Sequence, residues 1–217
     1  MSGARASEKR ALALVAAGTE EMELVITVDV LRRCGIEVTV ALVSETKVGQ
    51  TEADLMAQCS RGVNLKADTT LHTFLTEKAA TDIGLPDVVI LPGGLEGSRL
   101  MAKASITKEL LQRCDAAGKL IAAICAAPTV LVAHGKMFVG RRVTSYPAFK
   151  DQLKDAGYVW EEPTANSPAG RVVRDGNLLT SMGPATSFDF ALNIGSILVG
   201  AEKAESVASG MLYKWPI

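Results

Sequence analysis

Cys125 is the residue of this chain whose type and setting point most directly to chemistry. It follows the apolar run Leu120–Ile124, short enough for a buried strand, and Pro128 three residues later favours the first turn of a helix. Ala123 and Ala127, two positions to either side, are small enough for the close backbone approach of a nucleophile elbow. A thiol at a helix N-terminus has a lowered pKa and reacts as the thiolate. The spacing fits an inert buried cysteine equally well, so both alternatives stay open.

Three acidic residues follow another predicted strand, the apolar run 11–17; they are Glu20, Glu21 and Glu23. Ligands of open α/β sheets bind beyond the carboxyl ends of the strands, so we expect these acids at the same sheet edge as Cys125. Carboxylates at a helix N-terminus also stabilise the helix by ~0.3–1 kcal/mol each, which is explanation enough for an acidic first turn. An acid directed inward would instead be protonated, because burial and a thiolate raise its pKa. The protonated acid could then donate a hydrogen bond to the Cys125 sulfur and later transfer a proton during a reaction.

A glycine pair, Gly93-Gly94, follows the buried run 87–91. It fits a tight turn, but glycine also lets backbone N–H groups approach a reacting oxygen. One such N–H, together with that of Ala126, would form an oxyanion hole.

The spacing of the cysteines and histidines indicates neither a metal site nor a catalytic Cys-His pair. The four cysteines, Cys34, Cys59, Cys114 and Cys125, contain no C-x-x-C pair, which argues against zinc and a disulfide scaffold and for a reducing compartment. His134 lies nine residues past Cys125, about 13 Å along a helix axis, and His72 belongs to a different region, where a packing or surface role fits better. We expect no metal and no cofactor.

Composition indicates one globular domain. The chain has 217 residues, 48% of them hydrophobic and 22% charged, and a formal net charge of -1, which gives no electrostatic case for nucleic acid. No apolar run approaches the ~20 residues of a membrane helix. We predict a flexible tail over residues 1–8 and a single domain over residues 9–217. A mitochondrial presequence is a weaker alternative, because the basic start is brief and contains Glu8.

Predicted strands and helices alternate along the chain. The strands are expected at 11–17, 36–43, 63–65, 87–91, 120–124, 142–144 and 158–160, with a hairpin at 172–180. The helices are expected at 24–31, 71–80, 106–117, 129–133, 148–156, 186–199 and 202–209. The polar stretch 44–61 is predicted as a loop with at most one short helix near 51–56. This alternation predicts a three-layer α/β domain with a mostly parallel sheet.

Five motifs in order resemble one family over nearly the whole chain from Lys9. They are A-G-T-E-E-M-E at 17–23, Q-C-S-R at 58–61, D-V-V-I-L-P-G-G at 87–94, I-A-A-I-C-A-A-P at 121–128 and L-T-S-M-G-P-A-T-S-F-D-F-A-L at 179–192. They are similar to the Parkinsonism-associated deglycase family, the DJ-one branch of the ThiJ/PfpI superfamily. The resemblance implies a flavodoxin-like sandwich, a homodimer, an oxidisable nucleophile at Cys125, a protonated Glu23 beneath it, and oxyanion donors at Gly94 and Ala126.

Two features depart from the family pattern. Where the family commonly has a histidine before a proline, this chain has Tyr146, a poor base near pH 7. General catalysis of ~10²–10⁴-fold could be weakened as a result. The polar stretch 44–58 is longer, which puts the entrance loop and the dimer edge in doubt. We expect Gly93, Tyr146 and Pro184 in the pocket, and Cys59 as a second redox thiol, although a buried inert role fits Cys59 almost as well.

The resemblance implies two functions. The first is a redox sensor in oxidative-stress protection, in which peroxide oxidises Cys125 to a sulfinate held by Glu23 and N–H groups; the missing histidine slightly favours it. The alternative is a glyoxalase or deglycase acting on methylglyoxal and its adducts through the same pair. A cysteine peptidase or redox chaperone is less well supported. Expected partners are a second copy of the chain and a small 2-oxoaldehyde or peroxide, with no nucleic acid and no membrane span. The expected location is the cytoplasm, with nucleus and mitochondrion as further sites.

Overall fold

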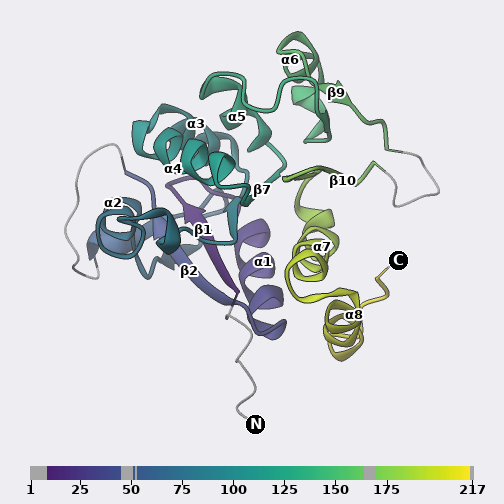
Figure 1. The fold of residues 1–217 in the computed structure, drawn as a ribbon, viewed down its shortest axis with the longest axis horizontal. Helices are drawn as coiled ribbons and strands as arrows, with labels where there is room; N and C mark the ends of the chain where they lie inside the picture. Colours follow the sequence, from purple (N-terminus) through teal and green to yellow (C-terminus); the bar gives the residue numbers. More distant parts are fainter. Residues whose placement is uncertain (1–8, 45–50, 52, 164–169, 216–217) are drawn as a thin grey trace.

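A seven-stranded sheet forms the centre of the molecule (Figure 1). The computed structural model describes residues 9–44, 51, 53–163 and 170–215. In spatial order the strands are β10 (Val172–Asp175), β11 (Leu178–Ser181), β7 (Leu120–Ile124), β6 (Val88–Leu91), β1 (Arg10–Val15), β2 (Glu37–Leu42) and β5 (Thr69–Thr70). Every neighbouring pair is parallel except β10 and β11, which form the predicted hairpin. The predicted α/β class with a mostly parallel sheet is confirmed.

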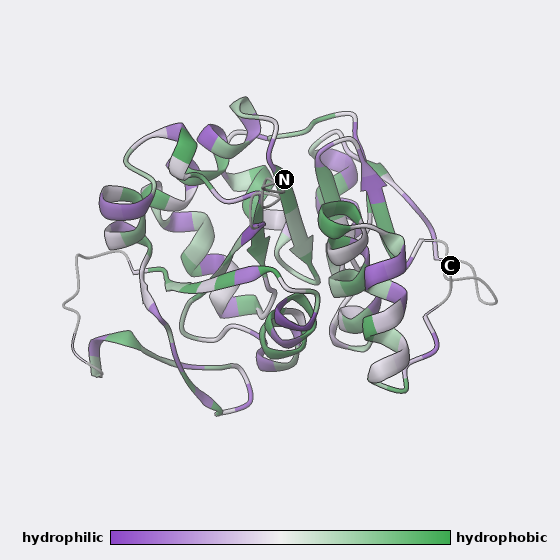
Figure 2. Ribbon diagram, turned by 60° about the horizontal axis from the view of Figure 1, so that its bottom comes forward, coloured by the Kyte–Doolittle hydropathy of each residue, from purple (hydrophilic) through white to green (hydrophobic). Residues whose placement is uncertain are grey.

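Helices cover both faces of this sheet (Figure 1). One layer contains α1 (Glu21–Arg33), α7 (Ser187–Val199) and α8 (Ala201–Gly210); the other contains α2 (Leu71–Thr73), α3 (Leu95–Lys103), α4 (Ser105–Ala116) and α5 (Pro128–Ala133). Alternate residues of β1 belong to separate cores: Ala13 and Val15 pack with α1 and α7, whereas Leu12 and Leu14 pack with α3, α4 and α5. Figure 2 shows the central strands as largely hydrophobic and the outer helix turns as mixed.

Smaller elements complete the fold around the central sheet. Two small sheets pair β3 (Met56–Gln58) with β4 (Asn64–Lys66), and β8 (Arg142–Val143) with β9 (Val159–Trp160). The helix α6 (Lys150–Asp155) precedes β9, and the short helical turns are η1 (Ala53–Leu55), η2 (Phe74–Lys78), η3 (Asp82–Gly84), η4 (Pro147–Phe149) and η5 (Pro184–Thr186). Within the described part of the chain, no helix combines the length and the apolar character needed to cross a membrane.

Most predicted elements are present, and three were missed: the strands β3 and β5 and the helix α3. The polar stretch 44–61 contains η1 near the expected place, but its end forms the strand β3. The helix α3 directly after Gly94 was not predicted, because Gly97 weakens its helix signal. Gly97 is needed there, since a Cβ would lie 2.8 Å from the Thr19 backbone. The predicted tail 1–8 and part of the polar stretch, residues 45–50 and 52, lie outside the described residues.

Register brings three strand ends to one edge of the sheet. Leu91 at the end of β6 is level with Ala123 of β7, and Ser181 at the end of β11 is level with Ile124. The Cys125 N–H continues this ladder by donating to the Ser181 carbonyl at 2.9 Å. Ala13 of β1 is likewise level with Ile90 of β6, so the residues that follow β1, β6 and β7 meet, as the parallel arrangement predicts.

Candidate active site

Cys125 occupies a strained turn between β7 and α5. Its φ of 64° lies in the left-handed region, which costs a non-glycine residue ~1–3 kcal/mol. The surrounding hydrogen bonds fix this conformation: the Cys125 N–H donates to Ser181, and the Cys125 carbonyl accepts from the Tyr146 N–H at 2.9 Å. Ala127 caps α5, and Pro128 is its first residue, as expected. The strained turn thus holds the sulfur at the edge of the sheet, where a ligand can reach it.

The elbow is tightly packed around small residues. Ala123 and Ala127 are fully buried. A Cβ on Gly93 would lie 2.6 Å from Cys125 Cβ and 2.7 Å from Glu23 Oε2, so only glycine fits between the thiol and the acid. Gly94 has a φ of 85°, and a Cβ there would lie 2.2 Å from the Gly18 carbonyl oxygen. The glycine pair is therefore required by close contact with the functional groups.

Glu23 is the acid that points inward. It is fully buried in the first turn of α1, and its Oε2 accepts a hydrogen bond from the Gly93 N–H at 2.6 Å. The Cys125 side chain lies beside this carboxyl group, with Gly93 between them, and Oε1 has no hydrogen-bond partner among the described residues. Burial, with a smaller contribution from the charge of Glu20, raises the pKa of Glu23 to about 7. A carboxyl with one N–H donor is poorly compensated as an anion, so the neutral acid is favoured.

The other two acids have structural roles. Glu20 caps α1 by accepting from the Glu23 N–H at 2.8 Å. Glu21 accepts from the Ser60 hydroxyl and the Arg61 N–H, both at 2.9 Å. Burial opposes the ionisation of Glu21, but these hydrogen bonds hold its pKa below the usual value. Glu21 therefore stays charged and ties the loop after β3 to α1.

Cys125 and Glu23 form a coupled pair. Burial and the charge of an ionised Glu23 raise the pKa of the Cys125 thiol to about 12, whereas the N–H groups of Gly94 and Ala126 lower it. The pair thus accommodates one negative charge but not two. On the sulfur, that charge would be met by two N–H groups and the Glu23 O–H; on the carboxyl, it would be met by one N–H and a weakly donating thiol. The donors favour a thiolate beside a neutral acid.

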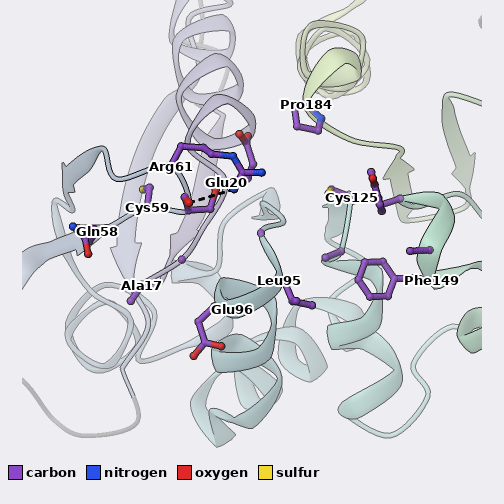
Figure 3. A pocket seen from close by; sticks show the side chains of 16 residues that line it. Ala17, Glu20, Gln58, Cys59, Arg61, Leu95, Glu96, Cys125, Phe149 and Pro184 are labelled. Carbon is purple, nitrogen blue, oxygen red and sulfur yellow. Dashed lines mark hydrogen bonds between the residues drawn. The ribbon is translucent and has the colours of Figure 1, made fainter.

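A pocket of about 760 Å³ opens over this pair (Figure 3). Six of the predicted site residues line it: Cys59, Gly94, Cys125, Ala126, Tyr146 and Pro184. Gly93 and Glu23 lie next to the sulfur without lining the pocket. Phe149 and Leu95 also line it, although neither was predicted. Both are close in sequence to predicted site residues: Phe149 is three positions after Tyr146, and Leu95 is one position after Gly94. That proximity was the available signal.

Cys59 faces the same pocket but is less accessible. It is 4% exposed, and burial together with the charges of Glu21 and Glu20 raises the pKa of its thiol to about 11. Its role as a second redox thiol stays a prediction. His134 is buried, with Nε2 2.9 Å from the Met101 carbonyl oxygen. Neither it nor His72 is among the described residues that line this pocket. The described residues contain no cluster of three or more metal-ligating side chains.

Comparison with known proteins gives a consistent assignment. A sequence model of the DJ-1/PfpI family matches residues 9–196. The chain is 44% identical over 204 residues to Protein dj-1beta of Drosophila melanogaster, covering 94% of this chain and 97% of that protein. It is 44% identical over 207 residues to the Parkinson disease protein 7 homolog of Danio rerio, covering 95% and 98%. It is 35% identical over 203 residues to the glutathione-independent glyoxalase DJR-1.2 of Caenorhabditis elegans, covering 93% and 95%.

Solved structures agree with the fold. The crystal structure of Drosophila melanogaster DJ-1beta has a TM-score of 0.83 at 44% identity and covers 96% of this chain and 100% of its own. An oxidised DJ-1 of Toxoplasma gondii has a TM-score of 0.77 at 32% identity, covering 95% and 100%. The family match spans most of the chain, and the elbow, the glycine pair and the buried acid lie within it. The chain belongs to the DJ-1/PfpI family.

Proposed function

We propose that this protein converts small 2-oxoaldehydes into 2-hydroxy acids without a cofactor, with Cys125 as nucleophile and Glu23 as proton carrier. The observation that carries the proposal is the fully buried Glu23 carboxyl beside the Cys125 side chain, with its pKa raised by burial to about 7. An acid with a pKa near the working pH can both give and take a proton. The glyoxalase of Caenorhabditis elegans, 35% identical to this chain, supports the same assignment.

The reaction begins with addition of the Cys125 thiolate to the aldehyde carbon. The new oxyanion receives N–H hydrogen bonds from Gly94 and Ala126 and is protonated by Glu23, which becomes a carboxylate. That carboxylate removes the proton from the former aldehyde carbon and gives an enediolate. After a proton passes between the two oxygens, Glu23 returns its proton to the second carbon and leaves a thioester. Water hydrolyses the thioester to the 2-hydroxy acid and the free thiol.

Tyr146 is compatible with this scheme. The family's commoner histidine would offer a second base, but the scheme gives both carbon proton transfers to Glu23. Glu23 lies beside the Cys125 side chain, whereas the Tyr146 backbone N–H donates a hydrogen bond to the Cys125 carbonyl. The absence of an imidazole at position 146 therefore lowers the expected rate without removing the route.

The test is lactate formation from methylglyoxal. We expect the wild-type protein to produce lactate and Cys125→Ser to produce none, with Cys59→Ser as the matched control because both thiols line one pocket. Product that persists in Cys125→Ser, or is absent from the wild type, would exclude the proposal.

Oxidation of Cys125 is a second candidate function, favoured by its accessibility. Cys125 is partly exposed, whereas Cys34, Cys59 and Cys114 are buried. One peroxide converts the thiolate to sulfenate and releases water, and a second converts sulfenate to sulfinate in the same way. Mass spectrometry after mild peroxide should show two oxygens on Cys125 before any on the buried cysteines. Oxidation without this order would exclude a sensor role.

We also propose that the protein forms a homodimer. Four apolar side chains on α1 and the β3–β4 hairpin are about half exposed; they are Met22, Val25, Met56 and Val63. Ser60 of that hairpin is hydrogen-bonded to Glu21 of α1, so the two elements are adjacent. An exposed apolar face of this kind is typical of a subunit contact. Val25→Glu should shift the mass measured by light scattering from dimer to monomer; an unchanged mass would place any contact elsewhere.

A further inference from the structure

We infer that Tyr146 and Phe149 form an aromatic subsite that selects 2-oxoaldehydes carrying an aryl group. The inference rests on the proposed function and adds its substrate class. It starts from the placement of Tyr146 beside the nucleophile. A Cβ on Gly183 would lie 3.8 Å from Tyr146 Cδ2 and 4.0 Å from Cys125 Sγ, so the ring and the sulfur flank the same small space. The Tyr146 residue is 50% exposed, which leaves part of its surface available to a ligand.

Phe149 continues this aromatic surface. The turn η4 brings it next to Tyr146, with ring centroids 6.5 Å apart and ring planes 59° apart. The two tilted rings can contact a third ring stacked on one and edge-on to the other. Both line the pocket that contains Cys125, together with apolar Leu95 and Pro184. Figure 3 shows Phe149 and Leu95 on the side of Cys125, with Gln58, Cys59 and Arg61 across the pocket.

The pocket is larger than a methyl-substituted substrate requires. Its volume is about 760 Å³. Pockets that enclose drug-sized ligands have volumes of roughly 300–1,000 Å³. Methylglyoxal bound through its aldehyde carbon at Cys125 presents only a methyl group to the two rings. A phenyl group in place of that methyl group, on the ketone carbon, would reach them and displace water from apolar surface. We therefore expect the pocket to prefer phenylglyoxal to methylglyoxal.

A second cavity next to the pocket limits which substitutions can test the aromatic subsite. It has a volume of about 450 Å³ and shares Tyr146 and Pro184 with the first. Truncation of Tyr146 to alanine would join the two cavities and change more than the aromatic contact. Leucine keeps most of the bulk and removes the ring, so Tyr146→Leu and Phe149→Leu are the informative changes. Tyr146→Phe keeps the ring and removes the hydroxyl.

The experiment measures initial-rate kcat/KM for phenylglyoxal and methylglyoxal. Initial rates exclude slow modification of arginine by either compound. We expect the wild type to prefer phenylglyoxal, and each leucine variant to lose roughly 3–10-fold more for phenylglyoxal than for methylglyoxal. The loss should appear mainly in KM, because the rings bind the substituent in ground state and transition state alike. Tyr146→Phe should retain the preference. The matched control is Ile83→Leu, at an exposed position in η3 outside the lining of the pocket.

The outcomes separate this inference from the proposed function. Equal losses for both substrates in the leucine variants, or no preference in the wild type, would overturn the subsite while leaving the reaction intact. If neither substrate gives Cys125-dependent product, the proposed function fails. The subsite is then judged by binding of 2-hydroxyacetophenone against hydroxyacetone, the unreactive alcohols related to the two substrates, measured by ligand-observed NMR. Binding of the aryl compound that weakens in both leucine variants supports the subsite; equal binding of the two alcohols contradicts it.

Discussion

Cys125 and Cys59 line one pocket, yet the groups around the two sulfurs differ in charge. The N–H groups of Gly94 and Ala126 lower the pKa of the Cys125 thiol, and the neighbouring acid is neutral below a pKa of about 7. The Cys59 sulfur lies 4.0 Å from the Ala57 carbonyl oxygen, an acceptor, and close to the carboxylates of Glu20 and Glu21. A negative charge is therefore compensated at Cys125 and opposed at Cys59.

The two thiols show that a place in the pocket is not enough to make a cysteine reactive. Both thiols are partly desolvated, and burial raises the pKa of each. What distinguishes Cys125 is the presence of donors that meet a charge on sulfur and of an acid that gives up its own charge. The strained elbow is the feature that provides them, because a positive φ at Cys125 sets its sulfur at the Gly93–Gly94 turn.

Substitution by serine at Cys125 and at Cys59 should give the largest difference in turnover. Cys125→Ser removes the nucleophile, and we expect the turnover of 2-oxoaldehydes to fall by ~10³-fold or more. Steady-state product formation measures this. A loss of less than about tenfold would show that another group carries the reaction.

Removal of the acid should have the next largest effect. Glu23→Gln keeps the shape of the side chain but cannot carry a proton between carbons, so kcat should fall ~10²–10⁴-fold. Glu20→Gln is the matched control, because Glu20 caps α1 without contacting the thiol through a hydrogen bond in the described structure. Equal losses in both variants would indicate a general effect on the helix rather than proton transfer.

Gly93→Ala tests whether the thiol and the acid are held at close contact. The new Cβ would lie within 2.7 Å of atoms of both Cys125 and Glu23, and we expect a loss of ~1–3 kcal/mol in the free energy of unfolding by urea. Gly210→Ala is the control, because a Cβ there meets nothing within 4 Å. A Gly93 variant as stable as the control would mean that the elbow is less tightly packed than the structure shows.

The raised pKa of Glu23 predicts a pH-dependent difference in stability. Its pKa is about 7 in the folded protein against an ordinary value of 4.5, so the folded state binds the proton more tightly than the unfolded state. As pH rises from 4.5 to about 7, the wild type should lose stability relative to Glu23→Gln. Thermal unfolding of both proteins across this window measures the difference. A constant difference would mean that Glu23 has an ordinary pKa.

The smallest effect is expected at Cys59. Cys59→Ser should change turnover by less than about twofold and leave the order of cysteine oxidation unchanged, because the thiol is buried and the charges of Glu20 and Glu21 oppose its ionisation. Mass spectrometry and lactate assays on the same preparation measure both. A large change in either would remove the distinction between the two thiols.

The sequence predicted those parts of the fold and site that depend on local pattern. The run 120–124 and Pro128 predicted the strand and the helix around Cys125, since both signals are short-range. The sequence could not distinguish the roles of Glu20, Glu21 and Glu23, because these depend on which acid meets the loop after β3 and which meets Gly93. The resemblance, not the spacing, singled out Glu23.

Other parts required the three-dimensional structure. The helix α3 was missed because Gly97 serves a close contact with Thr19, a long-range requirement that weakens the local helix signal. The pairing of Phe149 with Tyr146 depends on the turn η4 and on the return of this segment to Cys125. Neither follows from periodicity.

The chemistry of the site depends most on where the pair of Cys125 and Glu23 carries its single negative charge. Infrared spectroscopy of the carboxylic acid band, assigned by its loss in Glu23→Gln, measures this across pH in the wild type and in Cys125→Ser. With a thiolate present, the wild-type band should persist above the pH of about 7 at which Glu23 alone would ionise. In Cys125→Ser it should disappear near that pH. Loss of the band at the same pH in both proteins would put the charge on the carboxyl and contradict the account.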